Sequence, residues 1–108
     1  MGLDQKSCIP CQGGVLPLNG TESGAYLENL DGWELINDGK AIKKHVEFKN
    51  FALSLDFVNK IGEIAEKEKH HPDIEFGWGY CDITVTTHKI DGLHENDFIL
   101  AAKIDAIT

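Results

Sequence analysis

Three histidines and one carboxylate are spaced along this chain in a way that could build a proton-transfer site. His70 and His71 are adjacent and are followed by Pro72, and His88 and Asp97 come further along. Histidine has the ordinary pKa that lies nearest neutrality, so clustered imidazoles can serve as general acid and general base. The chain has five histidines, and three of them belong to this group. The sequence therefore predicts an enzyme.

These residues also have simpler structural explanations. Adjacent histidines at a helix end are commonly just solvated, and a tryptophan at strand spacing such as Trp78 more often packs in a core. Metal binding by His70, His71 and His88 is a further alternative, since three imidazoles suffice for a catalytic zinc ion. Adjacent residues coordinate one ion awkwardly, so we expect no metal at this site.

Composition indicates one domain and excludes several classes of protein. The 108 residues carry a net charge of −8, whereas contacts to nucleic-acid phosphates need a basic surface. No apolar run approaches the roughly 20 residues that span a bilayer. The first residues also lack the apolar core and cleavage site of a signal peptide. We therefore expect a cytoplasmic protein that binds neither nucleic acid nor membrane.

Residues 1–20 are rich in glycine and proline and predict a flexible leader, with Cys8 and Cys11 as a Cys-x-x-Cys pair. Such a pair can be redox-active or can supply half of a zinc site. No second ligand pair follows at zinc-site spacing, and the pair precedes every periodic segment, so we interpret it as two reduced thiols in a flexible tail. Residues 21–108 form the folded domain, where Cys81 falls within a strand pattern and indicates packing.

The hydrophobic pattern of this domain predicts a helix, two strands, a long helix, two strands and a final helix. Asn37-Asp38-Gly39-Lys40 indicates a tight turn in the first hairpin. Asn50 is a suitable N-cap for the long helix, which Pro72 cannot continue. The predicted segments cover residues 21–30, 33–36, 41–48, 50–69, 74–78, 83–88 and 95–107.

Two hairpins separated by a helix favour an α+β two-layer sandwich, in which one four-stranded antiparallel sheet carries the helices on one face. The other face and two edge strands stay uncovered, which predicts self-association. The ends of the long helix, the fourth strand and the last helix can meet at one rim, which would bring His70, His88 and Asp97 together. Gly62 costs the long helix roughly 1 kcal/mol relative to alanine, and a close helix–helix contact would explain it.

The spacing around the histidines is more specific than the residues themselves. Three residues separate Glu66 from His70, and gaps of five, nine and eight residues separate Pro72, Trp78, His88 and Asp97. This pattern resembles the pterin-4a-carbinolamine dehydratase family over about residues 21–108. Flanking segments resemble it too: Gly32-Trp33, Phe48-Lys49-Asn50-Phe51, Thr87-His88, Gly92-Leu93 and Asn96 to Ala102.

The resemblance implies a dehydratase that acts on 4a-hydroxytetrahydropterin, the product that aromatic amino acid hydroxylases release. Loss of water gives quinonoid dihydropterin, which a separate reductase returns to tetrahydropterin. By motif position, His71 and His88 would be the acid and base, and His70 would bind the pterin and assist. The residues expected to bind or orient the substrate are Glu66, Trp78, Thr87 and Asp97.

The resemblance also implies that the pterin is the substrate, that no cofactor is needed, and that the protein is a homodimer or homotetramer with a functional link to a hydroxylase. A second hypothesis is a non-catalytic binding, dimerisation or assembly module on the same fold, since the family includes such proteins. Those homologues would be expected to lose motif histidines, and this chain keeps all three. A third hypothesis is a metal-dependent hydrolase. The chain departs from the family pattern at His94, where serine or threonine usually begins the last helix.

Overall fold

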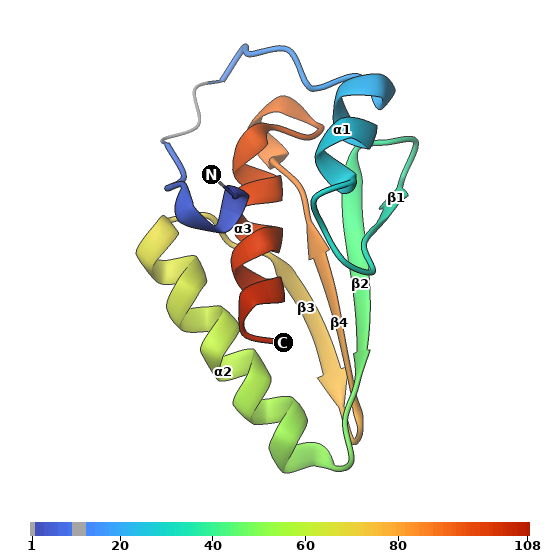
Figure 1. The fold of residues 1–108 in the computed structure, drawn as a ribbon, viewed down its shortest axis with the longest axis vertical. Coiled ribbons are helices and arrows are strands. Elements are labelled where there is room, and N and C mark those ends of the chain that lie inside the picture. Colours follow the sequence, from blue (N-terminus) through green and yellow to red (C-terminus); the bar gives the residue numbers. More distant parts are fainter. Residues whose placement is uncertain (1, 10–12) are drawn as a thin grey trace.

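The computed structural model describes residues 2–9 and 13–108 and has the predicted α+β architecture (Figure 1). Four strands form one antiparallel sheet in the order β1-β2-β4-β3, and the three α-helices lie on one of its faces. The elements are η1 (Leu3–Gln5), α1 (Gly20–Leu27), β1 (Glu34–Ile36), β2 (Ala41–Glu47), α2 (Phe51–Glu68), β3 (Asp73–Gly77), β4 (Tyr80–Val85), η2 (His88–Ile90) and α3 (Glu95–Ala106). The predicted element order and fold class are confirmed.

The two hairpins depend on residues that accept a left-handed backbone. Asn37, Asp38 and Gly39 have φ angles of 51°, 56° and 80°, as the turn signal between β1 and β2 predicts. Between β3 and β4, Gly79 has a φ of 83° in a two-residue turn. This turn contains Trp78, which is 72% exposed, so β3 ends at Gly77, one residue before the predicted end of the third strand.

The uncovered face of the sheet is polar. It carries the side chains that alternate with the core residues of β2, β3 and β4, which include Lys43, His45, Asp73, Glu75 and Asp82. The edge strands are β1 and β3. The described residues of a single chain therefore leave the sheet face and both edges without a covering layer, as the sequence predicts.

The long helix α2 begins and ends as its sequence indicates. The Asn50 side chain accepts a hydrogen bond from the Leu53 amide at 2.9 Å, and Lys69 ends the helix with a φ of 56°. The buried face contains Phe57, Ile61 and Ala65, spaced by one helical turn, and it packs on the core of the sheet. No helix among the described residues is long and apolar enough to cross a membrane.

Gly62 is not explained by a close contact within this chain. A methyl group added at its α-carbon would meet no atom within 4 Å in the described part of the chain. The expectation of a close helix–helix contact at this glycine is therefore not met within one chain.

The division of the chain at residue 20 stays a prediction, and α1 begins at Gly20 rather than one residue later. Cys11 lies outside the described residues. The described leader residues 2–9 lie against α3, where the Lys6 ammonium contacts the Glu95 carboxylate at 2.8 Å. The Tyr26 hydroxyl donates to the same carboxylate at 3.2 Å.

These contacts predict an acid-dependent contribution to stability. The hydrogen bond and charge of Lys6 lower the Glu95 pKa below its ordinary value near 4.5, and the nearby His94 acts in the same direction. A lowered folded-state pKa stabilises the fold above the unfolded-state pKa, and this contribution is lost as pH falls through the folded-state value. Between about pH 5 and pH 3, the free energy of unfolding should fall less steeply in Glu95→Gln than in the wild type. Chemical denaturation across this range, with the exposed Glu63→Gln as control, measures the difference.

Candidate active site

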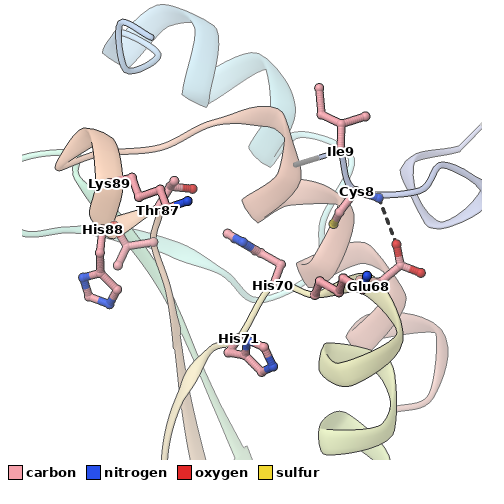
Figure 2. A pocket seen from close by; sticks show the side chains of 10 residues that line it. Cys8, Ile9, Glu68, His70, His71, Thr87, His88 and Lys89 are labelled. Atoms are coloured by element: carbon pink, nitrogen blue, oxygen red, sulfur yellow. Dashed lines mark hydrogen bonds between the residues drawn. The ribbon is translucent and has the colours of Figure 1, made fainter. Parts of the chain in front are cut away.

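A pocket of about 440 Å³ lies where the C-terminal end of α2, the end of β4 and the N-terminal leader meet (Figure 2). The three histidines of the sequence motif line this pocket together with Thr87. The remaining lining residues are Cys8, Ile9, Glu68, Lys69, Thr86 and Lys89. The prediction that ends of α2, β4 and α3 converge at one rim of the sheet is met, since Asp97 of α3 contacts His70.

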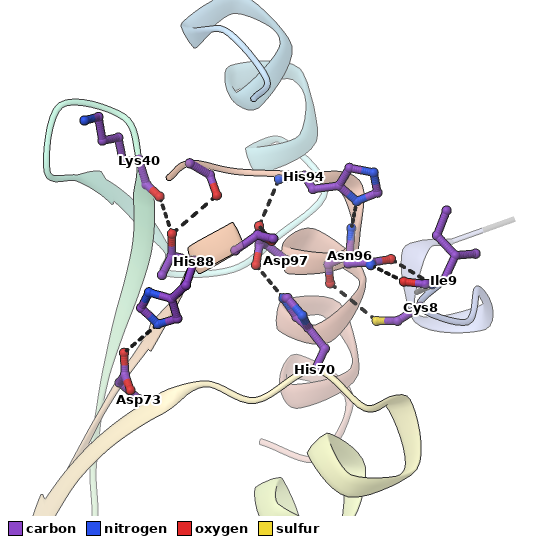
Figure 3. Close-up of polar contacts among 12 residues, drawn as sticks. Cys8, Ile9, Lys40, His70, Asp73, His88, His94, Asn96 and Asp97 are labelled. Carbon is purple, nitrogen blue, oxygen red and sulfur yellow. Dashed lines mark hydrogen bonds and ion pairs between the residues drawn. The ribbon is translucent and has the colours of Figure 1, made fainter. Parts of the chain in front are cut away.

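His70 is held by a buried carboxylate (Figure 3). Its Nε2 atom lies 2.6 Å from Asp97 Oδ1, and the His70 and Asp97 side chains are 11% and 0% exposed. The other carboxylate oxygen, Oδ2, accepts hydrogen bonds from the Thr87 hydroxyl at 2.8 Å and the His94 amide at 2.9 Å. An ionised carboxylate only accepts hydrogen bonds, so this geometry favours a proton on His70 Nε2 and leaves Nδ1 as the basic nitrogen.

Local sequence explains why both partners are rigid. Asp97 is the third residue of α3, where a carboxylate commonly pairs with the N-cap amide, here that of His94. The His94 ring itself accepts from the Asn96 amide at 3.2 Å, so histidine replaces the usual serine or threonine as the cap. The backbone of His70 is fixed at the C-terminal end of α2, where its amide donates to the Ala65 carbonyl at 3.2 Å.

His71 pairs with Glu66 at the mouth of the pocket. The His71 Nε2 atom lies 2.5 Å from Glu66 Oε2, and the two side chains are 60% and 78% exposed. The last turn of α2 places Glu66 beside the residue that follows the helix end. Unlike His70, this imidazole is open to solvent and to a ligand.

His88 lines the pocket from the opposite strand end. It opens the turn η2 after β4, and the pairing of Thr87 with Gly92 closes this turn. Its Nε2 atom lies 3.8 Å from Asp73 Oδ2, and both side chains are more than 70% exposed. Carboxylates at hydrogen-bond distance can therefore orient the rings of His70 and His71, whereas Asp73 lies too far from His88 for a hydrogen bond.

Trp78 is the one sequence-predicted site residue that the fold does not bring to the pocket. It lies in the β3–β4 turn, at the end of the hairpin remote from the histidines (Figure 1). Because a strand rises roughly 3.3 Å per residue, Trp78 lies about 16 Å along β3 from Asp73. The other six predicted residues either line the pocket or hold one that does.

Sequence reasoning missed Asp73 and the leader residues Cys8 and Ile9. Asp73 follows Pro72 directly, but only the sheet brings it beside His88. Nothing in the sequence places Cys8 and Ile9 beside residues about 60 and 90 positions away. Burial raises the pKa of the Cys8 thiol to about 12, so it is protonated at neutral pH and poorly suited to act as a nucleophile.

The described residues contain no group of three histidine, cysteine or acidic side chains arranged to share a metal ion. The reason is geometric, since Nε2 of His70, His71 and His88 each faces a different carboxylate.

Comparison with known sequences identifies relatives along nearly the whole chain. The sequence model described as "Pterin 4 alpha carbinolamine dehydratase" matches residues 16–107. A protein of Rubrobacter xylanophilus, provisionally named pterin-4-alpha-carbinolamine dehydratase, is 52% identical over 105 residues, which are 97% of each chain. A protein of Halorhodospira halophila with the same provisional name is 50% identical and covers 99% of this chain and 98% of its own.

Two solved structures share the fold. The transcriptional coactivator/pterin dehydratase of Brucella melitensis has a TM-score of 0.79 and 33% identity, covering 84% of this chain and 97% of that chain. A second structure is described as a pterin dehydratase-like protein that is a RuBisCO assembly factor in the alpha-carboxysome. It has a TM-score of 0.61 and 24% identity, covering 71% of this chain and 89% of that one. The second likeness shows the fold alone.

Proposed function

The chain belongs to the pterin 4 alpha carbinolamine dehydratase family, and we propose that it dehydrates 4a-hydroxytetrahydropterin to quinonoid dihydropterin and water. The observation that carries this proposal is one pocket lined by three imidazoles, two of which, His70 and His71, contact a carboxylate at hydrogen-bond distance. Proton donors and acceptors that work near neutral pH are what the dehydration needs.

The reaction breaks the bond between C4a of the pterin and its hydroxyl oxygen. Hydroxide is a poor leaving group, so a proton must reach this oxygen as it departs as water, while a ring N–H gives up its proton to a base. His71 and His88 are the exposed imidazoles of the pocket and line it from two different elements, which suits them to the acid and base roles. No electrons are exchanged with the protein, and the proton count is restored through solvent.

His70 has a different part, since its ring is nearly buried and its Nε2 is committed to Asp97. We assign it to binding and orienting the pterin through Nδ1, with Asp97 and Thr87 fixing the ring and its tautomer. Glu66 would orient His71 in the same way. We keep Trp78 as a candidate substrate contact only for an assembly in which another chain brings this residue near the pocket.

The same proposal covers the cofactor requirement, the metabolic role, the cellular location and the oligomeric state of the protein. The pterin is the substrate and no metal or other cofactor takes part, and the reaction serves an aromatic amino acid hydroxylase in the cytoplasm. The uncovered sheet face, the edge strands β1 and β3, and three exposed apolar side chains of α2 support a homodimer or homotetramer. These side chains are Phe51, Leu53 and Leu55.

A non-catalytic assembly module is the second candidate function. The observation in its favour is the shared fold with a protein described as a RuBisCO assembly factor. The retained His70, His71 and His88 in one pocket favour catalysis instead, since an assembly role does not need paired imidazoles.

A stopped-flow assay with 4a-hydroxytetrahydropterin tests the proposal. The purified wild type should accelerate loss of water over the spontaneous reaction, and dialysis against EDTA should leave the rate unchanged. Metal analysis of the same preparation is the control. A rate equal to the spontaneous one would favour the assembly module, and stoichiometric zinc with loss of rate after EDTA would contradict the metal-free mechanism.

A further inference from the structure

The N-terminal leader is packed against the body both within residues 2–9 and near residue 18. In the first part, the Lys103 ammonium donates to the Asp4 carbonyl at 2.9 Å. In the second part, the Leu18 amide donates to the Leu93 carbonyl at 2.9 Å. A β-carbon added at Gly92 would lie only 2.6 Å from Pro17 Cβ, so the leader approaches this loop as closely as a glycine permits.

Asn96 binds one leader residue with both halves of its side-chain amide (Figure 3). Its Oδ1 atom accepts from the Ile9 amide at 3.0 Å, and its Nδ2 atom donates to the Ile9 carbonyl at 2.6 Å. Asn96 is only 2% exposed, so withdrawal of the leader would leave a buried amide without these partners. The Asn96 side chain therefore holds the backbone of Ile9 in place, because loss of these two hydrogen bonds would leave buried polar atoms unpaired.

Glu68 provides a second attachment. Its Oε1 atom accepts from the Cys8 amide at 2.9 Å, its side chain is 6% exposed, and Lys103 lies 3.9 Å from its other oxygen. Both attachment points are close neighbours of site residues, since Asn96 precedes Asp97 and Glu68 lies two residues before His70. The position of the leader is thereby tied to the backbone that carries His70 and Asp97.

Ile9 lines the pocket and is 62% exposed as a residue. Ile9 thus offers the pocket an exposed apolar side chain on a fixed backbone. Such a side chain can pack against the face of a flat ring, because the faces of the ring are apolar and its edges carry the hydrogen-bonding groups. The family model matches residues 16–107, so Ile9 lies outside the matched segment.

We propose that the leader forms one wall of the pterin pocket, in which Ile9 contacts the face of the ring and Asn96 is the positioning residue that holds Ile9 there. This inference rests on the proposed function, because it names the pterin as the ligand. It assigns the leader a role in substrate affinity and leaves the proton transfers to the histidines.

Steady-state kinetics of full-length variants with 4a-hydroxytetrahydropterin test the wall. Ile9→Ala and Asn96→Ala should each raise KM about tenfold, as expected for a lost apolar contact, with kcat nearly unchanged. The double variant should resemble either single one, since both remove the same contact. Leu16→Ala is the matched control, because Leu16 is an apolar leader residue that is 86% exposed and does not line the pocket.

Hydrogen exchange of the Cys8 and Ile9 amides tests the attachment without any turnover. Both amides should be protected in the wild type and in Ile9→Ala, and the Ile9 amide should lose protection in Asn96→Ala. Unprotected amides in the wild type would overturn the attachment. If the wild type is active but KM is unchanged in Ile9→Ala and Asn96→Ala, the leader does not contact the substrate, and only this inference is overturned. If the wild type is inactive, the proposed function is overturned and with it the assignment of the pterin.

Discussion

Replacement of His71 by alanine is expected to lower kcat for pterin dehydration by about 10² to 10⁴ without unfolding the protein. Loss of a positioned acid or base typically costs this much, because the departing hydroxyl or the ring N–H then exchanges its proton with water alone. The His71 side chain is 60% exposed and outside the core, so its removal should leave the free energy of unfolding within about 0.5 kcal/mol of the wild type. Single-turnover kinetics and chemical denaturation measure the two quantities.

His45→Ala is the matched control. His45 is also a half-exposed imidazole in contact with a carboxylate, but it lies on the uncovered sheet face, where the hydrogen bond to Asp82 raises its pKa. This variant should keep the wild-type kcat. Wild-type rates in His71→Ala would refute the assignment of His71.

His88→Ala, assayed with each 4a epimer separately, shows which imidazole acts on which face. If the two histidines act on opposite faces of the ring, the variants His71→Ala and His88→Ala should differ in the epimer that they fail to convert. Equal losses with both epimers would indicate that each turnover uses both rings.

Asp97→Asn is expected to lower activity by about 100-fold or more while keeping the fold. An asparagine Oδ1 atom can still accept from Thr87 and His94, but its amide nitrogen would then donate toward His70 Nε2. His70 would have to accept there, which moves its proton to Nδ1 and reverses the nitrogen offered to the pterin. Thermal or chemical denaturation beside kcat and KM separates this tautomer effect from instability.

Asp97→Ala has a different expected outcome. It leaves the Thr87 hydroxyl and the His94 amide without their acceptor beside a buried site, at a cost of roughly 2–6 kcal/mol. This is a large part of the stability of an ordinary domain, so loss of activity in Asp97→Ala carries less information than loss in Asp97→Asn.

Asp105→Asn is the matched control for Asp97→Asn. Asp105 accepts from the Trp33 indole, the Lys44 ammonium and the Asp31 amide at the other end of α3, away from the pocket. Its replacement should lower stability and leave kcat unchanged. If Asp97→Asn likewise lost only stability, Asp97 would act as a helix cap and not as the partner of His70.

The elements whose signals are local can be predicted from the sequence alone. The apolar residues of α2 recur at helical spacing, Asn50 caps its first turn, and Asn37, Asp38 and Gly39 accept the left-handed backbone of the first hairpin. Each of these signals involves residues only a few positions apart, so it can be read without the fold. The histidine spacing likewise predicted which three imidazoles would share a pocket.

The carboxylates beside these imidazoles and the leader residues beside the pocket depend on tertiary contacts. Asp73 meets His88 through the pairing of β3 with β4 and the course of the chain beyond β4, and Ile9 meets Asn96 across 87 positions. The sequence predicts that the third strand includes Trp78, because this residue continues an apolar alternation. In the structure the chain turns at Trp78 and Gly79, whose φ is positive, and this turn lies at the end of the hairpin remote from the pocket. Register, turn position and leader packing arise from contacts between distant segments, and no periodicity along the chain records them.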